Sequence, residues 1–562
     1  MSTERVFVSE ERAMVRAAGQ IGFYTLLSRM TGLVRDIVIG SVFGAGSSAD
    51  AFFVAFRIPN LLRRVVGEGA TAAALVPVIT EYLTSHSRAE AMVMVRALFG
   101  AGIAVLLVLT VAGVVSAEPL ARLFAPGFSP AKLALTIALT RITFLYLFCI
   151  GLVALAMGVL HALRHFAAPA FAPLWLNLAL ILCALWLPAH LAEPVFSLAY
   201  GVVIGGLCQF VWQLLPLAHL GVPLLPQWRP RHPAVRRVAF LLLPVLFGAA
   251  VYQISLLVNT LLASLLAEGS VSALWYASHL FEFPMAIFAT ALSTAALPSL
   301  ATQAQQQDLE GIGASLGFAL RLVNLVTLPA AAGLAVLAVP LTTVLFFHGV
   351  FNASHVLATA AALRGFAVGL WSVAAARLLS SCFYALEDTR TPVYTGSVAF
   401  VTNICFSLML MGEITADADA PGLARFFAGL SRSLTMYDLG VAGLALAASL
   451  AATVNLVLLG GLLHRRLGRL PWPGCGSSLL WSLSASMTMA VLVRWIAQQI
   501  DWLDPEISFV VRLGVLVLAV AAGTTSFLLI VWQGGSGELR ALIGMLPEPL
   551  LRILPQFLQP RG

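Results

Sequence analysis

Long apolar runs, separated by short polar gaps, follow one another along almost the entire chain. Of its 562 residues, 60% are hydrophobic and 10% are charged, whereas a water-soluble domain carries about 25% charged residues. Water cannot solvate a surface with so little charge, so most of it must face lipid, where each spanning helix needs about 20 apolar residues. The expected spans are 17–44, 49–82, 92–117, 133–160, 168–189, 194–219, 236–265, 271–302, 313–340, 354–385, 392–411, 437–463, 476–499 and 507–533.

A short internal repeat indicates how these spans are grouped. Residues 46–56 read GSSADAFFVAF and residues 269–279 read GSVSALWYASH, each after one long apolar run and each followed by a proline, Pro59 or Pro284. Six expected spans separate the copies, so the copies share one orientation, which is typical of a parallel repeat. We therefore expect an all-α integral membrane protein of about fourteen transmembrane helices. Two six-helix lobes would be related by a parallel pseudo-two-fold repeat, followed by two C-terminal helices; a chance match between two helix starts is the alternative.

The placement of arginine predicts the orientation. Alternate gaps hold the arginines, and the gaps between them hold the acidic residues Glu118, Glu193, Glu268 and Asp501. The positive-inside rule makes the arginine-rich gaps cytoplasmic, and an even helix count then places both termini there. The expected parts are a cytoplasmic segment 1–16, an N-lobe 17–219, a basic cytoplasmic loop 220–235, a C-lobe 236–463 with an outer loop 412–436, and a C-terminal part 464–562 with two spans and a cytoplasmic tail.

Several classes of function are not supported by the sequence. There is no G-x-x-x-x-G-K-[ST] motif for a nucleotide, and the basic residues occupy short gaps instead of one domain face, which argues against nucleic acid. The six cysteines form no C-x-x-C pair and fit reduced packing residues. We expect neither a metal nor a cofactor.

Residues 29–68, within the first two expected spans, contain eight charged residues: Arg29, Arg35, Asp36, Asp50, Arg57, Arg63, Arg64 and Glu68. A charge at the centre of a spanning helix costs about 2.5–3.5 kcal/mol on insertion scales, so these side chains cannot all face lipid. Five cations against three anions leave a surplus of positive charge, which predicts a cavity for an anion. Arginine suits phosphate because its planar group donates two hydrogen bonds at once. As an alternative, Arg63 and Arg64 are positive-inside anchors at a membrane surface.

Polar residues in later spans allow two interpretations. Glu282 lies within the eighth expected span with His279 on the same face, which fits either a cavity pair or a histidine packed inside the bundle. Asn403 and Ser407 in the eleventh span could offer oxygens to sodium, but with no carboxylate nearby, hydrogen bonds between helices are the simpler interpretation.

Several motifs resemble those of the MurJ/MviN family of lipid II flippases, over essentially the whole chain. They include Ser28-Arg29-x-x-Gly32-x-x-Arg35-Asp36, Phe43-Gly44-Ala45-Gly46-x-x-x-Asp50-Ala51-Phe52, Arg57-x-Pro59-Asn60-Leu61-Leu62-Arg63-Arg64, Glu282-Phe283-Pro284 and Asp388-Thr389-x-Thr391-Pro392. The resemblance implies the fold of the multidrug/oligosaccharidyl-lipid/polysaccharide (MOP) exporter superfamily, with two lobes around a central cavity and transport by alternating access. It also implies that the last two spans form a groove for the lipid tail.

The resemblance further implies roles for single residues. The family's cavity residues correspond to Arg29, Arg35, Asp36, Asp50, Arg63, Arg64, Glu68 and Glu282. With His279 and Arg57 added from their positions in the spans, we expect substrate binding at Arg29, Arg35, Arg63, Arg64, Glu282 and His279, and a gating charge network at Asp36, Asp50, Arg57 and Glu68. Family members typically show Asp-Arg where this chain has Ser278 and His279, so one cavity cation is here a titratable imidazole. The seventh and eleventh spans lack the carboxylates of a sodium site, and we do not predict sodium coupling.

The resulting prediction is a transporter and not an enzyme. We expect it to flip lipid II, an undecaprenyl-pyrophosphate-linked disaccharide peptide, from the cytoplasmic to the periplasmic leaflet of a bacterial inner membrane during peptidoglycan synthesis. Membrane lipids and cell-wall synthesis proteins are candidate partners. The alternatives are a flippase for another polyprenyl-linked glycan, a drug or cation exporter of the same superfamily, and a membrane-embedded glycosyltransferase.

Overall fold

The computed structural model describes the backbone of most of the chain. The described ranges are 2–67, 70–223, 225–286, 290–414, 422–468, 474–534 and 537–544, and side chains are described for 22–61, 74–223, 225–242, 255–286, 292–294, 296–414, 422–468, 474–534 and 537–540. Across these residues the chain is helical, and its only β-type pairing is an isolated bridge between Met411 and Asp438.

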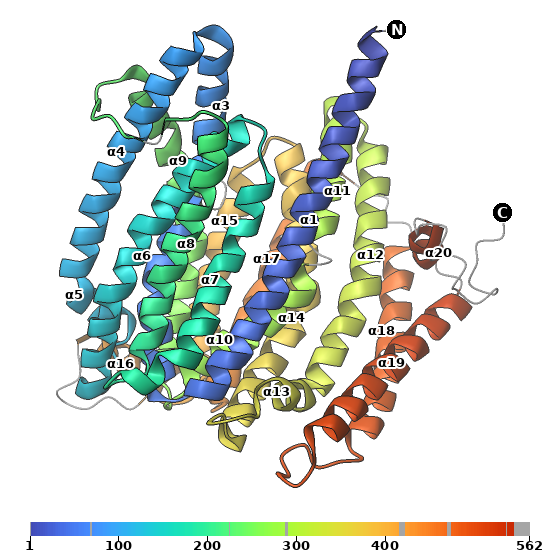
Figure 1. Ribbon diagram of the computed structural model, residues 1–562. Coiled ribbons are helices and arrows are strands. Elements are labelled where there is room, and N and C mark those ends of the chain that lie inside the picture. The colour runs from blue at the N-terminus through green and yellow to red at the C-terminus, as the bar shows by residue number, and fades with distance from the viewer. Residues whose placement is uncertain are drawn as a thin grey trace. The chain divides into compact units, whose positions relative to one another are not determined.

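Every expected span corresponds to helix in the structure (Figure 1). The first six are α1 (Ser2–Phe43), α2 (Ser47–Gly67) with α3 (Ala70–Ser85), α4 (Arg88–Val115), α6 (Pro130–Ala162), α7 (Ala167–Trp186) and α8 (Phe196–His219). The next six are α9 (Pro233–Ser264), α10 (Ser270–Pro284) with α11 (Thr290–Gln305), α12 (Leu309–Val336), α14 (Ala353–Ala385), α15 (Arg390–Leu410) and α17 (Gly440–Leu467). The last two are α18 (Cys475–Ala497) and α19 (Phe509–Gln533).

Short helices not expected from the sequence join these spans. They are α5 (Ala117–Phe124), the 3₁₀ turn η1 (Pro188–His190), α13 (Ala338–Phe346), α16 (Gly422–Leu434) and α20 (Gly537–Gly544). The outer loop predicted at 412–436 thus contains a helix, α16, which is held by the Ser431 hydroxyl. This hydroxyl accepts from the Ile414 amide at 2.9 Å and donates to the Gly412 carbonyl at 3.1 Å.

Ten described helices are long and apolar enough to cross a membrane: α4, α6, α7, α8, α12, α14, α15, α17, α18 and α19. In the first, second, seventh and eighth expected spans the side chains are described only in part, so ten is the number of such helices in the described part of the chain.

Packing within the chain follows the same repeat. In the first half, α3, α4 and α5 each contact α6, and α8 contacts both α6 and α7. In the second half, the corresponding helices α11, α12 and α13 each contact α14, and α17 contacts both α14 and α15. The short helices α5 and α13 each follow the third span of their half. The repeat inferred from eleven residues around Gly46 and Gly269 therefore extends to the order and packing of the helices.

The contacts divide the chain into two compact units. The first comprises Met1–Ser272, His348–Phe351 and Ala416–Phe426; the second comprises Ala273–Phe347, Asn352–Thr415 and Phe427–Gly562. The helix α9 belongs to the first unit because it packs against α2, α3, α4 and α5. In the second unit, α18 and α19 pack on each other, and α18 packs on α12 (Figure 1). The predicted lobe boundaries at 219 and 236 remain predictions.

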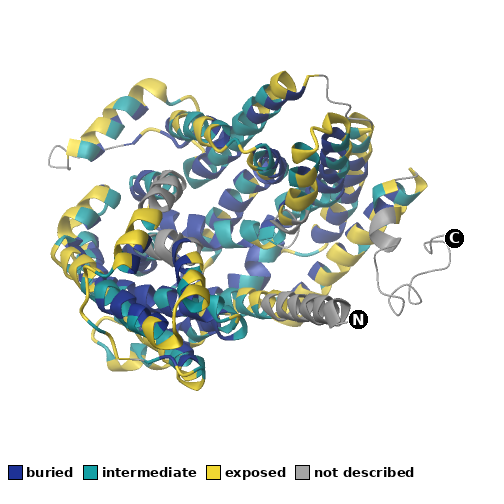
Figure 2. Cartoon of the chain, turned by 90° about the horizontal axis from the view of Figure 1, so that it is seen from above, coloured by how far each residue is buried: buried dark blue, intermediate teal, exposed yellow. Residues whose placement is uncertain are grey.

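Many helices carry exposed residues (Figure 2), and large apolar side chains are numerous among them. On α4 they include Val105, Val108, Val111 and Val115. Continuous apolar faces of this kind are rare on water-soluble proteins. With the ten apolar helices they identify a multi-span membrane protein.

Two glycine loops repeat one unusual contact in the first unit. A Cβ on Gly127, after α5, would lie 2.2 Å from the Ser264 carbonyl oxygen at the end of α9. A Cβ on Gly349, after α13, would lie 2.1 Å from the Ser41 carbonyl oxygen near the end of α1, and its φ is +60°. Each loop therefore rests on the first helix of the opposite repeat, at a distance that only glycine permits.

The turn between α14 and α15 is organised by Asp388. Its carboxylate accepts from the Arg390 and Thr391 amides, both at 3.0 Å, and from the Thr391 hydroxyl at 2.8 Å. The guanidinium of Arg466, at the end of α17, pairs with the same carboxylate. The hydrogen bonds from Thr391, more than the charge of Arg466, hold the pKa of Asp388 below its ordinary value.

Candidate functional site

Arg35 is held in a fixed position on α1 by two neighbours. Its Nε and Nη2 donate to Asp36 Oδ1 at 3.0 and 2.7 Å, and its Nη1 donates to Asn177 Oδ1 on α7 at 3.0 Å. The side chains of Arg35 and Asp36 are only 13% and 4% exposed. A guanidinium has five N–H donors, so two remain beyond these three bonds for a further acceptor.

Asn177 also joins α7 to the preceding turns of α1. Its Nδ2 donates to the Ser28 carbonyl at 3.0 Å and to Thr31 Oγ1 at 3.2 Å. Because one amide group contacts both Arg35 and the turn that carries Arg29, the two arginines share a rigid support. Arg29 itself is exposed, and it forms no ion pair with any carboxylate in the described part of the chain.

Asp50 has a different set of partners. Its carboxylate is buried, with 1% of the residue exposed. Oδ2 accepts from Lys132 Nζ and from the Gly269 amide, both at 2.8 Å. Oδ1 accepts from the Ser272 amide at 2.8 Å and from its hydroxyl at 2.6 Å. We call this arrangement of Asp50, Lys132, Gly269 and Ser272 the Asp50 cap.

The Asp50 cap connects the start of α2 to the start of α10. A carboxylate at a helix N-terminus satisfies amides that lack an intrahelical partner and interacts favourably with the helix dipole. The two starts also touch through backbone, since a Cβ on Gly269 would lie 2.3 Å from the Ala45 carbonyl oxygen. In the structure Asp50 therefore pairs with Lys132 and caps the start of α10.

Arg57 lies between α2 and α9. Its Nη1 donates to Thr260 Oγ1 at 2.6 Å and to the Leu256 carbonyl at 3.3 Å. Arg57 thus connects the second expected span to the seventh through neutral acceptors. The remaining predicted residues of α2, the side chains of Arg63 and Arg64 and the whole of Glu68, lie outside the described residues.

His279 and Glu282 lie on α10, within the second unit. The imidazole of His279 packs edge-on against Trp275, with ring centroids 4.7 Å apart. Glu282 is half-buried on the same helix. Both residues stay candidates for substrate binding.

Two residues of the site were not predicted. Lys132 is the only lysine of the chain, and its position just before an apolar span could have drawn attention to it. Asn177 lies in the middle of the run 168–189, where an amide needs a partner. Neither pairing could be read from the sequence, because Asp50 and Lys132 are 82 positions apart, and Arg35 and Asn177 are 142 apart.

The described residues contain no cluster of three or more histidine, cysteine or acidic side chains that could hold a metal ion. In α15, the Ser407 hydroxyl lies 3.5 Å from Asn403 Oδ1, and both residues are buried. The groups of this site that suit an anion are the guanidinium groups of Arg35, which has two donors left, and of the exposed Arg29.

Comparison with protein families gives one match that covers most of the chain. The family described as "Lipid II flippase MurJ" matches residues 39–512. A relative from Vibrio cholerae, described as "Probable lipid II flippase MurJ", is 35% identical over 511 residues, which cover 87% of this chain and 92% of the relative. A "Lipid II flippase MurJ" from Burkholderia cenocepacia is 36% identical over 495 residues, with 87% and 91% covered.

Solved structures show the same fold. A lipid II flippase MurJ in an inward closed conformation matches with a TM-score of 0.72 and 23% identity, over 90% of this chain and 98% of that one. A multidrug resistance MATE family transporter of the MOP superfamily, in an inward-facing conformation, matches with a TM-score of 0.62 and 14% identity, over 79% and 95%. The fold expected from the sequence is confirmed by these structures and by the helical architecture.

Proposed function

Since this chain belongs to the MurJ family of lipid II flippases, we propose that it flips lipid II with the arginines of α1 and α2 holding the anionic headgroup. It is a transporter and not an enzyme, and lipid II transport places it in peptidoglycan synthesis. The observation that supports the site is Arg35, which Asp36 and Asn177 hold in place while two of its donors remain available. A side chain fixed in advance loses little conformational entropy when it binds phosphate.

The roles within the site follow from these contacts. Arg35 donates to a pyrophosphate oxygen, and Arg29, exposed about two turns away on the same helix, supplies a second cation. Arg63 and Arg64, whose backbone belongs to α2, are further cations for the headgroup, and Glu282 and His279 of α10 bind its polar groups. Asp36 is a positioning residue, because it acts on the substrate through Arg35.

The Asp50 cap acts as the gate. Opening the contact between the starts of α2 and α10 breaks three hydrogen bonds to one carboxylate, those from the Gly269 amide and from the Ser272 amide and hydroxyl. Such a contact resists opening until binding energy compensates for its loss, which gives the transporter discrete states. Arg57 belongs to the same network, because it fastens α2 to α9.

The orientation is part of the proposal. The arginine-rich gaps face the cytoplasm, so both termini are cytoplasmic and the helices α5, α13 and α16 lie at the periplasmic side. Lipid II enters from the cytoplasmic leaflet, and its tail stays in lipid along α18 and α19. Proteins of cell-wall synthesis would then meet the product at the periplasmic face.

A drug or cation exporter is the alternative that shares the fold, since MATE transporters match the structure. Arginine at the candidate site argues against it, because a cationic substrate needs an acidic or apolar cavity. A flippase for another polyprenyl-linked glycan would use the same cationic site. Family membership favours lipid II.

Lipid II sidedness in cells depleted of this protein tests the proposal. A probe that cleaves only outward-facing lipid II should find less of it while total lipid II rises, and re-expression of the wild type should reverse both changes. If lipid II stays accessible while another polyprenyl-linked glycan accumulates inside, the substrate assignment is wrong.

Arg35→Ala tests the site in the same assay. A charge-assisted hydrogen bond contributes about 1.5–3 kcal/mol, so turnover should fall roughly ten- to hundred-fold at limiting substrate. Arg122→Ala is the matched control, because Arg122 is half-exposed and pairs only with Glu118 on its own helix. Equal turnover in Arg35→Ala and wild type, at equal expression, would remove Arg35 from the substrate site.

A further inference from the structure

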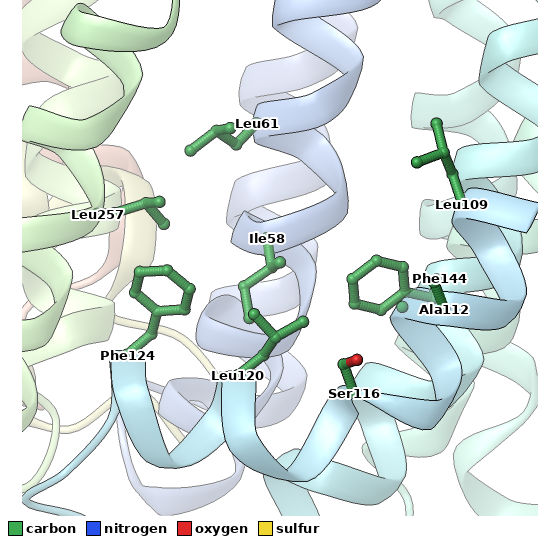
Figure 3. A pocket seen from close by; sticks show the side chains of 10 residues that line it. Ile58, Leu61, Leu109, Ala112, Ser116, Leu120, Phe124, Phe144 and Leu257 are labelled. Atoms are coloured by element: carbon green, nitrogen blue, oxygen red, sulfur yellow. The ribbon is translucent and has the colours of Figure 1, made fainter. Parts of the chain in front are cut away.

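An apolar pocket opens between α2, α4, α5, α6 and α9 in the first unit (Figure 3). Its volume is about 370 Å³. Ile58 and Leu61 of α2, Leu257 of α9, Leu120 and Phe124 of α5, and Phe144 of α6 supply most of its walls. Ser116 is the only one of its ten lining residues with a polar side chain.

This lining excludes the headgroup of the transported lipid. A pyrophosphate or sugar moved from water into this pocket would leave its polar groups without partners, which is costly. A hydrocarbon chain loses nothing by entering, and the volume lies in the lower range for small-molecule sites. The pocket therefore fits one chain and no polar group.

The pocket is continuous with the surface that faces lipid. Leu109 and Ala112 form its edge on α4 and are exposed, and the same helix presents Val108 and Val111 to the outside. Phe144, at the base, is 2% exposed. Its ring packs so closely on Gly113 that a Cβ added there would lie 2.0 Å from the ring. The pocket is thus closed by the protein at its base and open toward the bilayer at its edge.

The helix α5 indicates how deep in the membrane the pocket lies and which type of lipid it suits. Leu120 and Phe124 point into the pocket (Figure 3), while Glu118 and Arg122 form an exposed ion pair at 2.8 Å. A short amphipathic helix with apolar residues on one face and charged residues on the other lies at the membrane–water interface. A pair of opposite charges complements a zwitterionic phospholipid headgroup, whereas a lipid-linked diphosphate carries only negative charge.

We propose that this pocket is a specific site for one acyl chain of a zwitterionic phospholipid of the outer leaflet, inserted between α2 and α9. The assignment to the outer leaflet rests on the orientation proposed above; the site itself does not depend on lipid II transport. Arg57, next to Ile58, bonds Leu256 and Thr260 on either side of Leu257. The acyl chain therefore occupies the space beside this polar contact, between Ile58 and Leu61 of α2 and Leu257 of α9.

Photolabelling in proteoliposomes tests the proposal. The probe is phosphatidylcholine with a diazirine in one acyl chain, and labelled sites are mapped by peptide mass spectrometry. Label should be enriched at Ile58, Leu61 and Leu257 relative to Val517 and Leu518, which are exposed on the outward face of α19. Excess unlabelled phosphatidylcholine should reduce the enrichment.

Ala112→Phe should abolish the enrichment, because Ala112 is exposed at the edge and a larger side chain can fill the pocket without displacing the core. Val108→Phe is the matched control, since Val108 is 66% exposed on the same helix and does not line the pocket. If Ala112→Phe fails to fold, Leu257→Phe, which fills the pocket from α9, takes its place.

Two results would overturn the proposal. Equal labelling of α2, α9 and α19, unchanged by Ala112→Phe, would mean that only bulk lipid contacts the pocket. Displacement by undecaprenyl diphosphate but not by phosphatidylcholine would assign the pocket to an isoprenoid chain. Because this readout needs no transport, its failure is distinguishable from failure of the lipid II assignment, which the sidedness assay tests.

Discussion

At the residue scale, the carboxylate of Asp50 shows what makes an ion pair inside a membrane protein tolerable. Removing a carboxylate and an ammonium from water is costly unless further hydrogen bonds satisfy them. Asp50 receives four donors, and Lys132 has a second contact in the ring of Phe128, whose centroid lies 4.1 Å from Nζ. The pair is therefore a structural centre as well as a candidate gate.

Asp50→Asn should destabilise the protein by about 3–5 kcal/mol, because it leaves the buried Lys132 ammonium without its counter-charge. The second change Lys132→Met should recover part of this loss by removing the unpaired charge. Thermal unfolding of the detergent-solubilised protein, measured as a double-mutant cycle, gives the coupling. Glu118→Gln is the control, since exposed pairs contribute about 0–1 kcal/mol. Additive effects of the two Asp50-cap substitutions would contradict this account.

Asp388 predicts how stability depends on pH. Its pKa is lower in the folded protein than in the unfolded chain, so it contributes stability that is present above the unfolded value of about 3.9 and is lost as the pH falls through the folded value. Asp388→Asn should therefore lower the melting temperature at pH 7, and the difference from wild type should shrink as the pH falls below about 4. A melting-temperature difference that stays constant down to pH 3 would mean that the substitution acts through altered hydrogen bonding or packing and not through the lost charge.

At the element scale, the loops that contain Gly127 and Gly349 contact backbone so closely that both positions should be more sensitive to substitution than their exposure suggests. Gly349→Ala places a Cβ against the Ser41 carbonyl and forces a positive φ on alanine, which costs about 1–3 kcal/mol. We expect a lower melting temperature for Gly349→Ala and little change for the control Gly333→Ala, whose Cβ would meet nothing within 4 Å. Equal melting temperatures for the two variants would show that the loop shifts without cost.

The sequence predicted long elements well and short ones poorly. Each expected span contains helix, because some twenty apolar residues in lipid have few other ways to satisfy their backbone. The spans at 49–82 and 271–302 each contain two described helices, one on either side of residues that lie outside the described part of the chain. The helices α5 and α13 have eight and nine residues, too few for a periodic pattern to be recognised.

The candidate site was predicted in part. The charge cluster in the first two spans follows from the energetic cost of charge in lipid, and Arg35 with Asp36 is one of its pairs in the structure. The partners Asn177 and Lys132 come from α7 and α6, and only the folded chain brings them to α1 and α2. Sequence identifies which residues cannot face lipid, whereas tertiary structure determines which neutral or charged group each one meets.

At the scale of the whole molecule, the surplus of cationic groups in residues 29–68 predicts that transport depends on the membrane potential. An inside-negative potential favours inward movement of positive charge by about 2.3 kcal/mol per charge per 100 mV. If the empty cationic site returns inward during the cycle, dissipating the potential in proteoliposomes should slow turnover. Measurement of lipid II flipping at several imposed potentials checks this, and Arg29→Gln should weaken the dependence. Turnover that is the same at every potential would mean that no net charge moves with the returning site.

The single lysine also has a practical consequence for chemical labelling. Every other cation in the chain is arginine, so the side-chain amine of Lys132 is the only target for an acylating reagent besides the chain's amino terminus. With 9% of its side chain exposed and its nitrogen bound to Asp50, that amine should react slowly in the conformation described. An amine-directed reagent therefore reports loss of the contact between Lys132 and Asp50 in the native sequence, without an introduced probe, and acylation of Lys132 during turnover would count openings of the Asp50 cap.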